Sequence, residues 1–211
     1  GPCPALPTAD VVFSILQPDH PNGLQAQLTK LVASFAASPQ NPTLCGATID
    51  ESAGPVIVEQ TAHIEPGSHL IGPCYVGHQA EIRHAAYVRQ FSWICSKAVV
   101  GHASETKHSI LLPGAKAPHF NYVGDSILGT GVNLGAGTKI SNLRNDGGEV
   151  HLRMDGARFG SGLRKFGAIL GERCQLGCNS VTNPGVILGC DSQVHPNTTV
   201  TGVYSADSRH G

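Results

Sequence analysis

A strict six-residue period constrains this chain more than any other feature of its sequence. Aliphatic residues recur at every sixth position without a slip: Val58, Ile64, Leu70, Val76, Ile82, Val88, Ile94 and Val100. The residue four positions after each of them is small, as in Ala62 and Ser68. An α-helix has 3.6 residues per turn, so a period of six would carry the aliphatic residues around the helix axis. Short parallel strands stacked as a three-sided prism would place them all inside, and the pattern therefore predicts a β-helix.

The repeat is interrupted twice in the second half of the chain. It lapses between Thr106 and Tyr122, resumes at Leu128, and breaks again until Leu170. Residues 144–164 read as an insertion, in which Asp155-Gly156 between alternating segments predicts a β-hairpin. This hairpin could roof a site or be a mere ornament of the coil. The last ten residues are expected to fray.

Residues 1–57 differ from the repeat and are predicted to form a helical N-terminal cap and lead-in. Apolar residues at helical spacing carry this prediction: Leu24, Leu28, Leu31, Val32 and Phe35. Asn22-Gly23 suits the start of the helix, and the stretch from Ser38 to Pro42 is expected to end it. A packing lid is the simpler function for this segment. Residues 58–211 are then the β-helix domain.

Composition excludes several classes of partner. The formal net charge is −1 and only 14% of residues are charged, so neither nucleic acid nor an anionic membrane is expected. No apolar run approaches the roughly 18–20 residues of a membrane span, and the first residues lack the basic region of a signal peptide. Seven cysteines without a CxxC pair make a disulfide framework improbable. Cys74 and Cys174 fall at small-residue positions and are expected to pack as core side chains. We expect a cytoplasmic protein.

The stretch 119–142 contains polar residues that the repeat does not require. His119 stands at a break in the repeat and is the best candidate for a general base. Asn133 and Asn142 flank Gly135-Ala136-Gly137, whose backbone amides could face a carbonyl group. Spacing alone leaves an alternative open, because Asn and Gly also suit tight corners and any one of eleven histidines could be a surface residue. His84 and His102, eighteen residues apart, are expected to stack on one outward face without a role.

A resemblance strengthens the interpretation as a site. The block HFNYVGDSILGTGVNLGAGTKISN resembles the acetyltransferase half of the bifunctional N-acetylglucosamine-1-phosphate uridylyltransferase/glucosamine-1-phosphate acetyltransferase family. That family has H-[LF]-x-Y-[LIV]-G-D, then V-N-[IL]-G-A-G-T, then a catalytic-site Asn. The likeness covers roughly residues 58–203. The hexads themselves resemble the hexapeptide-repeat family, which implies a left-handed parallel β-helix and a homotrimer with sites between subunits.

The resemblance implies roles for the residues of acyl transfer. His119 is expected to be the general base that deprotonates the amine of the sugar, and Asn142 to orient that amine. The amide of Ala136 is expected to stabilise the oxyanion. Acetyl-CoA is expected to lie against Ala136, Cys178 and Pro196. The amine attacks the thioester directly, so a covalent enzyme intermediate is not needed.

The resemblance also implies how the acceptor is bound. Cations and a phenol suit a sugar phosphate, whereas polar groups suit the sugar hydroxyls. The residues expected to bind the phosphate are Arg89, Lys107, Tyr122 and Lys165, of which Lys165 could be contributed by a neighbouring subunit. Glu105 and Asn133 are expected to contact the hydroxyls.

The chain departs from the family pattern at three places. Leu143-Arg144-Asn145 replaces the Tyr-Asp-Gly that follows the catalytic-site Asn, and the insertion ending in RKFGAILG resembles archaeal-type sugar-1-phosphate nucleotidylyltransferases with a β-helix tail. Cys178 stands where the family has Ser near acetyl-CoA. A G-x-G-T-R-M nucleotidylyltransferase loop does not occur in the sequence, so we expect any uridylyl transfer to be done by a separate protein.

The leading hypothesis is an acetyl-CoA-dependent N-acetyltransferase acting on an amino-sugar 1-phosphate in UDP-N-acetylglucosamine biosynthesis. The main alternative is a non-catalytic β-helix that binds sugar nucleotides or scaffolds a separate nucleotidylyltransferase. A metal-dependent β-helix hydratase would need histidines near H-x4-H spacing, whereas the histidine pairs 63/69, 78/84 and 102/108 are six apart. No metal is expected for acetyl transfer.

Overall fold

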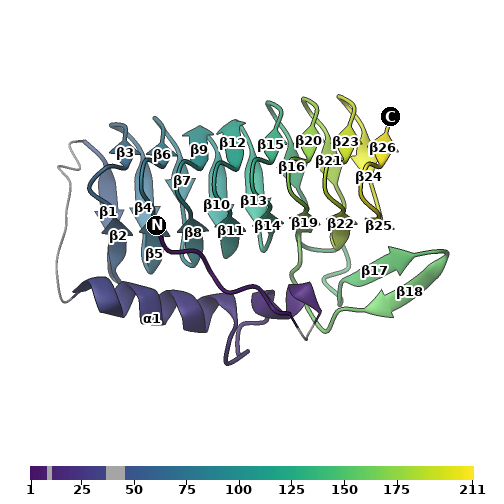
Figure 1. Ribbon diagram of the computed structural model, residues 1–211, viewed down its shortest axis with the longest axis horizontal. Helices are drawn as coiled ribbons and strands as arrows, with labels where there is room; N and C mark the ends of the chain where they lie inside the picture. Colours follow the sequence, from purple (N-terminus) through teal and green to yellow (C-terminus); the bar gives the residue numbers. More distant parts are fainter. Residues whose placement is uncertain (9–10, 37–45) are drawn as a thin grey trace.

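A computed structural model of the protein describes residues 1–8, 11–36 and 46–211 and shows a three-sided parallel β-helix (Figure 1). Each turn of the chain contributes one short strand to each of three sheets, and each sheet has eight strands. Strands that are neighbours in a sheet are parallel and come from successive coils. The fold class predicted from the hexads, a parallel β-helix of the hexapeptide-repeat kind, is confirmed.

The three faces of the prism are named sheets A, B and C. Sheet A consists of β1 (Thr48–Asp50), β4 (His69–Ile71), β7 (Tyr87–Val88), β10 (Glu105–Lys107), β13 (Tyr122–Gly124), β16 (Lys139–Ile140), β21 (Val181–Thr182) and β24 (Thr199–Val200). Sheet B consists of β2 (Val56–Val58), β5 (Cys74–Val76), β8 (Ser92–Ile94), β11 (Ser109–Leu111), β14 (Ile127–Leu128), β19 (Ala168–Leu170), β22 (Val186–Leu188) and β25 (Val203–Tyr204). Sheet C consists of β3 (His63–Ile64), β6 (Glu81–Ile82), β9 (Val99–His102), β12 (Lys116–His119), β15 (Asn133–Leu134), β20 (Gln175–Leu176), β23 (Gln193–Val194) and β26 (Arg209–His210).

Both ends of the prism extend further than the repeat pattern indicates. The strand β1 lies inside the predicted lead-in 1–57, where Ile49 pairs with Leu70 outside the six-residue spacing. At the other end β25 and β26 join sheets B and C. The prediction that the last ten residues fray is therefore wrong, because their backbone groups pair with the preceding coil.

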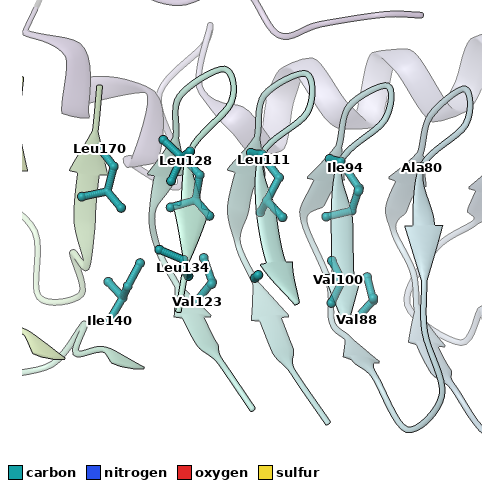
Figure 2. Close-up of a cluster of buried hydrophobic side chains, with 14 of the residues drawn as sticks. Ala80, Val88, Ile94, Val100, Leu111, Val123, Leu128, Leu134, Ile140 and Leu170 are labelled. Carbon is teal, nitrogen blue, oxygen red and sulfur yellow. The ribbon is translucent and has the colours of Figure 1, made fainter. Parts of the chain in front are cut away.

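The aliphatic residues of the hexads fill the interior of the prism. Figure 2 shows Ile94, Leu111, Leu128 and Leu170 following one another along one face. All four are at most 1% exposed, and burial of a Leu or Ile side chain contributes roughly 1.5–3 kcal/mol. Cys74 and Cys174 are also fully buried, as predicted.

The lapse in the repeat is a shortening of two coils by one residue each. Leu111 pairs with Ile94 and Leu128 pairs with Leu111, so the inner column continues without a break. Hydrogen bonds between these coils join residues 17 apart, whereas other coils show 18. The missing residue is at the corner between sheets A and B, where His108 and Asp125 adopt φ of 43° and 49°.

The N-terminal helices cover the outer face of sheet B. Figure 1 shows α1 (Leu24–Ala36) running along the prism beneath the strands of this sheet, with the 3₁₀ helix η1 (Val12–Leu16) beside it. The outward side chains of sheet B are apolar and form one cluster with these helices: Tyr75, Trp93, Ile110, Ile127 and Ile169. The predicted helix is confirmed, although it covers a side of the prism rather than its end. Its predicted stop from Ser38 to Pro42 lies outside the described residues.

The insertion is a hairpin that leaves the prism after sheet A. The strands β17 (His151–Met154) and β18 (Ala157–Gly160) are antiparallel, and Asp155 and Gly156 both have positive φ, as a two-residue hairpin turn requires. An antiparallel bridge between Leu143 and Lys165 closes the base of the insertion, directly outside the predicted range 144–164. Within the described ranges, no helix is both long and apolar enough to cross a membrane.

Candidate functional site

The residues expected to act on the acyl group form one column at the corner between sheets C and A. Backbone hydrogen bonds stack the corners of successive coils: the N–H of Gly137 donates to the carbonyl of His119 at 2.9 Å, and the N–H of Asn179 donates to that of Ala136 at 2.8 Å. The next coil continues in the same way, from Asn197 to the carbonyl of Cys178. His119, Ala136, Cys178 and Pro196 therefore hold the same corner position in successive coils.

This corner presents backbone N–H groups that are not used by the fold. Among the described residues, the N–H groups of Ala136 and Cys178 donate to no hydrogen-bond acceptor. A Cβ on Gly135 would lie 2.5 Å from the backbone N of Cys178, so only glycine leaves that N–H open. Free N–H groups beside a base can stabilise a developing oxyanion.

A buried asparagine holds the backbone at His119. The side-chain oxygen of Asn121 accepts from the N–H of His119 at 2.9 Å, and its amide donates to the carbonyl of Gly135 at 2.8 Å. Phe120, which stands between His119 and Asn121 in the chain, adopts a positive φ of 53°. Sequence reasoning missed Asn121, although its place between His119 and Tyr122, in a block of polar residues that the repeat does not require, was a usable signal. The imidazole of His119 itself is exposed.

The outer face of sheet A brings together three of the residues expected to bind the acceptor. Glu105 pairs in register with Tyr122 of the next coil, and Nη1 of Arg89 lies 2.8 Å from Oε1 of Glu105. Burial, and then the negative charges of Glu105 and Asp125, raise the pKa of Tyr122. The phenol therefore stays protonated and can donate a hydrogen bond to an anion.

Asp125 connects this face to Asn142. It is 4% exposed. Its carboxylate accepts from Nδ1 of His108 at 3.0 Å, from Nζ of Lys107 at 3.2 Å, and from the side-chain amide of Asn142. Burial raises the pKa of Asp125, but the hydrogen bond from His108, the charge of Lys107 and the hydrogen bond from Asn142 outweigh it, so the pKa lies below its ordinary value. The sequence shows this residue as part of the HxxYxGD block, but the pattern alone gave it no role.

A cavity of about 610 Å³ adjoins Asp125. The prism contributes Lys107, His108 and Asp125 to its wall, the base of the insertion contributes Lys165, and the N-terminal segment contributes Leu16. Nε2 of His108 is buried and has no hydrogen-bond partner in the described part of the chain. Lys165 thus reaches this cavity from its own chain, whereas Arg89 and Tyr122 do not line it.

Two expected residues lie away from sheet A. Asn133 is half-buried on sheet C, in register between Lys116 and Gln175. Pro196 lines a shallower cavity of about 320 Å³ on sheet C. Within one chain the structure does not bring Asn133 to Glu105, its expected companion at the sugar hydroxyls.

His84 and His102 stack as predicted, with ring centroids 5.6 Å apart and 7° between the planes.

The structure also bears on metal binding. In the described ranges, no group of three or more His, Cys, Asp or Glu side chains is placed to hold a metal ion.

Comparison with known proteins places the chain. Residues 70–208 match the family described as the GMPPB C-terminal domain. The chain belongs to this family. It is 40% identical over 147 residues to a bifunctional sugar-1-phosphate nucleotidylyltransferase/acetyltransferase of Sulfurisphaera tokodaii, covering 70% of this chain and 37% of the relative. It is 34% identical over 155 residues to the bifunctional protein GlmU of Methanococcus aeolicus, covering 74% and 38%.

These relatives confirm the resemblance identified from the sequence. The chain spans less than two fifths of the length of either one. Among solved structures, an Arabidopsis UDP-N-acetylglucosamine acyltransferase is 11% identical with a TM-score of 0.40, covering 76% of this chain and 68% of that one. The enzyme class predicted from the sequence, a hexapeptide-repeat acetyltransferase, agrees with the relatives' names.

Proposed function

We propose that this chain is an acetyl-CoA-dependent N-acetyltransferase whose acceptor is an amino sugar that carries a phosphate at C1. The observation that carries the proposal is the corner column. His119 lies one coil from Ala136, whose N–H has no acceptor within the described residues. A base and an oxyanion donor at adjacent positions are what direct aminolysis of a thioester requires.

The chemistry follows from this arrangement. The sugar amine attacks the thioester carbonyl carbon of acetyl-CoA, and its proton passes to the imidazole of His119. The N–H of Ala136 stabilises the oxyanion. The tetrahedral intermediate collapses by breaking the C–S bond, which releases the CoA thiolate and leaves the acetamide. The thiolate takes up the proton from His119, so the enzyme returns to its starting state.

The acceptor lies on sheet A in this proposal. Asn142, fixed by Asp125, orients the amine, and Arg89, Lys107, Tyr122 and Lys165 bind the phosphate. Lys107 and Lys165 line the same cavity, which supports this assignment. Two cations suit a phosphate dianion.

Self-association completes the proposed site. Because α1 covers sheet B, copies of the chain would pair through sheets A and C, which flank the corner with His119. We propose a homotrimer in which Asn133 on sheet C of one copy reaches the sugar hydroxyls beside Glu105 on sheet A of another. The product would then be a substrate for a separate nucleotidylyltransferase that makes a UDP-sugar in the cytoplasm.

The test is thiol release from acetyl-CoA with glucosamine 1-phosphate as acceptor. His119→Ala should lower kcat by roughly 10²–10⁴-fold, the usual contribution of a general base, without lowering Tm because the side chain is exposed. His84→Ala is the matched control, since it changes a histidine at the same corner two coils earlier. Full activity in His119→Ala would exclude this base. If the wild-type protein neither releases thiol nor binds acetyl-CoA by calorimetry, the non-catalytic scaffold is the better description. Galactosamine 1-phosphate in the same assay identifies the preferred sugar.

A further inference from the structure

The insertion encloses a second cavity, about 410 Å³ in volume, that none of the expected site residues lines. Its walls come from the outer edge of sheet A and from the hairpin β17–β18, which lies beside the last coils of the prism (Figure 1). Sheet A and the loops after it contribute Ser141, Leu143, Asn183, Pro184 and Thr201, and the insertion contributes Arg144, Asn145, Asp146, His151, Arg153 and Arg158.

Two arginines face one another in this cavity without an acid between them. Arg153 and Arg158 are directly opposite in the register of the hairpin, so their side chains leave the same face of it. Among the residues that the structure describes, neither forms an ion pair. Like charges directly opposite on paired strands destabilise a hairpin. The sequence therefore maintains an unfavourable pair where it lines a cavity.

The opposite face of the same hairpin is apolar. Strand alternation puts Leu152, Met154 and Phe159 on that side. The hairpin is thus sorted into a cationic face toward the cavity and an apolar face away from it.

The third arginine of the cavity, Arg144, is neutralised by an ion pair and adds no net charge. Arg144 pairs with Asp146, and that bond lowers the pKa of Asp146 to about 2, so the pair stays ionised and neutral as a whole. Nη1 of Arg144 also lies 2.9 Å from Nδ1 of His151. Because a guanidinium only donates, Nδ1 accepts this hydrogen bond. Arg153 and Arg158 leave the cavity with two positive charges in excess.

We propose that this hairpin cavity binds the phosphate groups of a nucleotide-containing ligand, with Arg153 and Arg158 as the anion-binding residues. Arginine forks match phosphate oxygens with two parallel hydrogen bonds. The hydroxyls of Ser141 and Thr201 line the same space. A volume of about 410 Å³ falls within the usual range for small-ligand sites, about 300–1,000 Å³.

Two kinds of ligand could supply the phosphates that this cavity binds. Asn183 belongs to the same coil as Cys178, and Thr201 to the same coil as Pro196, so the cavity lies across sheet A from the column proposed to hold acetyl-CoA. The phosphates of the donor could lie there. A sugar nucleotide carries the same chemistry in its diphosphate. The binding site itself does not depend on acetyl transfer, so it can be tested without turnover.

Calorimetry with two probes tests the proposal on the full chain. One probe is 3′-phosphoadenosine 5′-phosphate, which keeps the 3′-phosphate and the first of the two 5′-phosphates of CoA without its pantetheine arm, and the other is UDP. Arg153→Gln/Arg158→Gln should weaken binding of at least one probe by tenfold or more. Added salt should weaken wild-type binding, since the contacts are between charges. The probe that binds more tightly identifies the source.

Arg173→Gln is the matched control, because Arg173 is an exposed arginine of the prism that does not line the cavity. It should bind both probes as the wild type does. Removing the opposed charges should leave Tm unchanged or raise it, so lost binding could not be explained by unfolding. Equal affinity in the double variant and the wild type, or wild-type protein that binds neither probe, would overturn the proposal.

Discussion

The side-chain amide of Asn142 donates a hydrogen bond to the carboxylate of Asp125, which lies 17 residues earlier in the chain, in the preceding coil. The same carboxylate accepts from Lys107 and His108. Asp125 therefore fixes the amide proposed to orient the amine and one cation proposed to hold the phosphate. Its proposed effect on the acceptor is exerted through these two side chains, so it is a positioning residue.

Asp125→Asn should lower the free energy of unfolding by about 3 kcal/mol at pH 7, the usual cost of breaking a buried ion pair. The carboxylate is buried, and the substitution keeps its shape while removing the charge that Lys107 and His108 face. Chemical denaturation of both proteins gives the difference. Asp19→Asn, at an exposed position, is the control and should change little.

The stability difference between wild type and Asp125→Asn should depend on pH. The folded-state pKa of Asp125 is below its ordinary value, so its contribution is fully present above the unfolded pKa of about 3.9. That contribution is lost as the pH falls through the folded pKa. The gap measured at pH 7 should therefore narrow below about pH 4. A gap of constant size down to pH 3 would show that the charge of Asp125 does not stabilise the fold.

Gly124→Ala should damage the site while leaving the prism intact. A Cβ at this position would lie 2.6 Å from Nδ2 of Asn142 and 2.6 Å from the hydroxyl oxygen of Tyr122. Both are ends of side chains that can move, so the fold survives and the site is displaced. A displacement near 1 Å can cost roughly 10²-fold in rate. We expect that loss in the thiol-release assay, with Tm nearly unchanged.

Gly101→Ala provides the contrasting variant. Its Cβ would lie 1.7 Å from the carbonyl oxygen of Pro118 in the next coil, and that backbone cannot yield without opening the stack. We expect a loss of about 3 kcal/mol of stability from this clash. If both glycine variants lose stability equally, Gly124 serves the fold rather than the site.

The six-residue period predicted which side chains face the interior of the prism, but it predicted little about the residues on its outer faces. Inner residues such as Ile82 and Val100 are dictated by packing, so they recur in every coil. The outer row of sheet B, with Tyr75 and Trp93, recurs only once per coil, every 17 or 18 residues, so the six-residue period does not single it out. A sequence pattern can show that a face is apolar, but it does not name what covers it.

The candidate site could be proposed from the sequence where it lies in one block and not where it depends on neighbouring coils. His119 and Ala136 stand in that block, and the corner column places them together. The connection of Asp125 to His108 and Lys107 arises only because two coils are one residue short, which the six-residue pattern registers as a lapse. The Asp155-Gly156 hairpin was predicted from local turn chemistry. The hairpin turns its cationic face toward sheet A because of its orientation relative to the prism. The local turn sequence does not determine that orientation.

Leu28→Ala tests whether α1 is an integral part of the fold. Leu28 is fully buried in the cluster with Trp93. Its truncation should cost about 2–5 kcal/mol, although Ala is itself a good helix former. Trp93 is the single tryptophan of the chain and is 3% exposed, so its fluorescence reports this face alone. We expect the emission to shift to the red at lower denaturant concentration than in the wild type.

Lys30→Ala, at an exposed position of the same helix, is the control for that measurement. It should leave the tryptophan transition where it is in the wild type. If Leu28→Ala also leaves it there, α1 is a dispensable cover.

Acetyl-CoA should protect Cys178 from alkylation. Cys178 is an exposed thiol in the column proposed to hold the donor, whereas Cys74 is buried and its pKa is raised to about 12 by that burial. Because the thiolate is the reactive form, iodoacetamide should modify Cys178 and leave Cys74 intact in the folded protein. Acetyl-CoA has no free thiol to consume the reagent. At ten times its Kd it should slow modification of Cys178 about tenfold, since only unliganded protein reacts.

Cys3 makes this measurement specific. It is also exposed, and it lies in the N-terminal segment, away from the corner column. Its rate of modification, followed by peptide mass spectrometry in the same sample, should not change with acetyl-CoA. Equal slowing at both thiols would indicate loss of reagent, and no slowing at either would place the donor elsewhere. Selective protection of Cys178 would locate the thioester arm along the coils above His119, which direct transfer of the acetyl group to a bound amine requires.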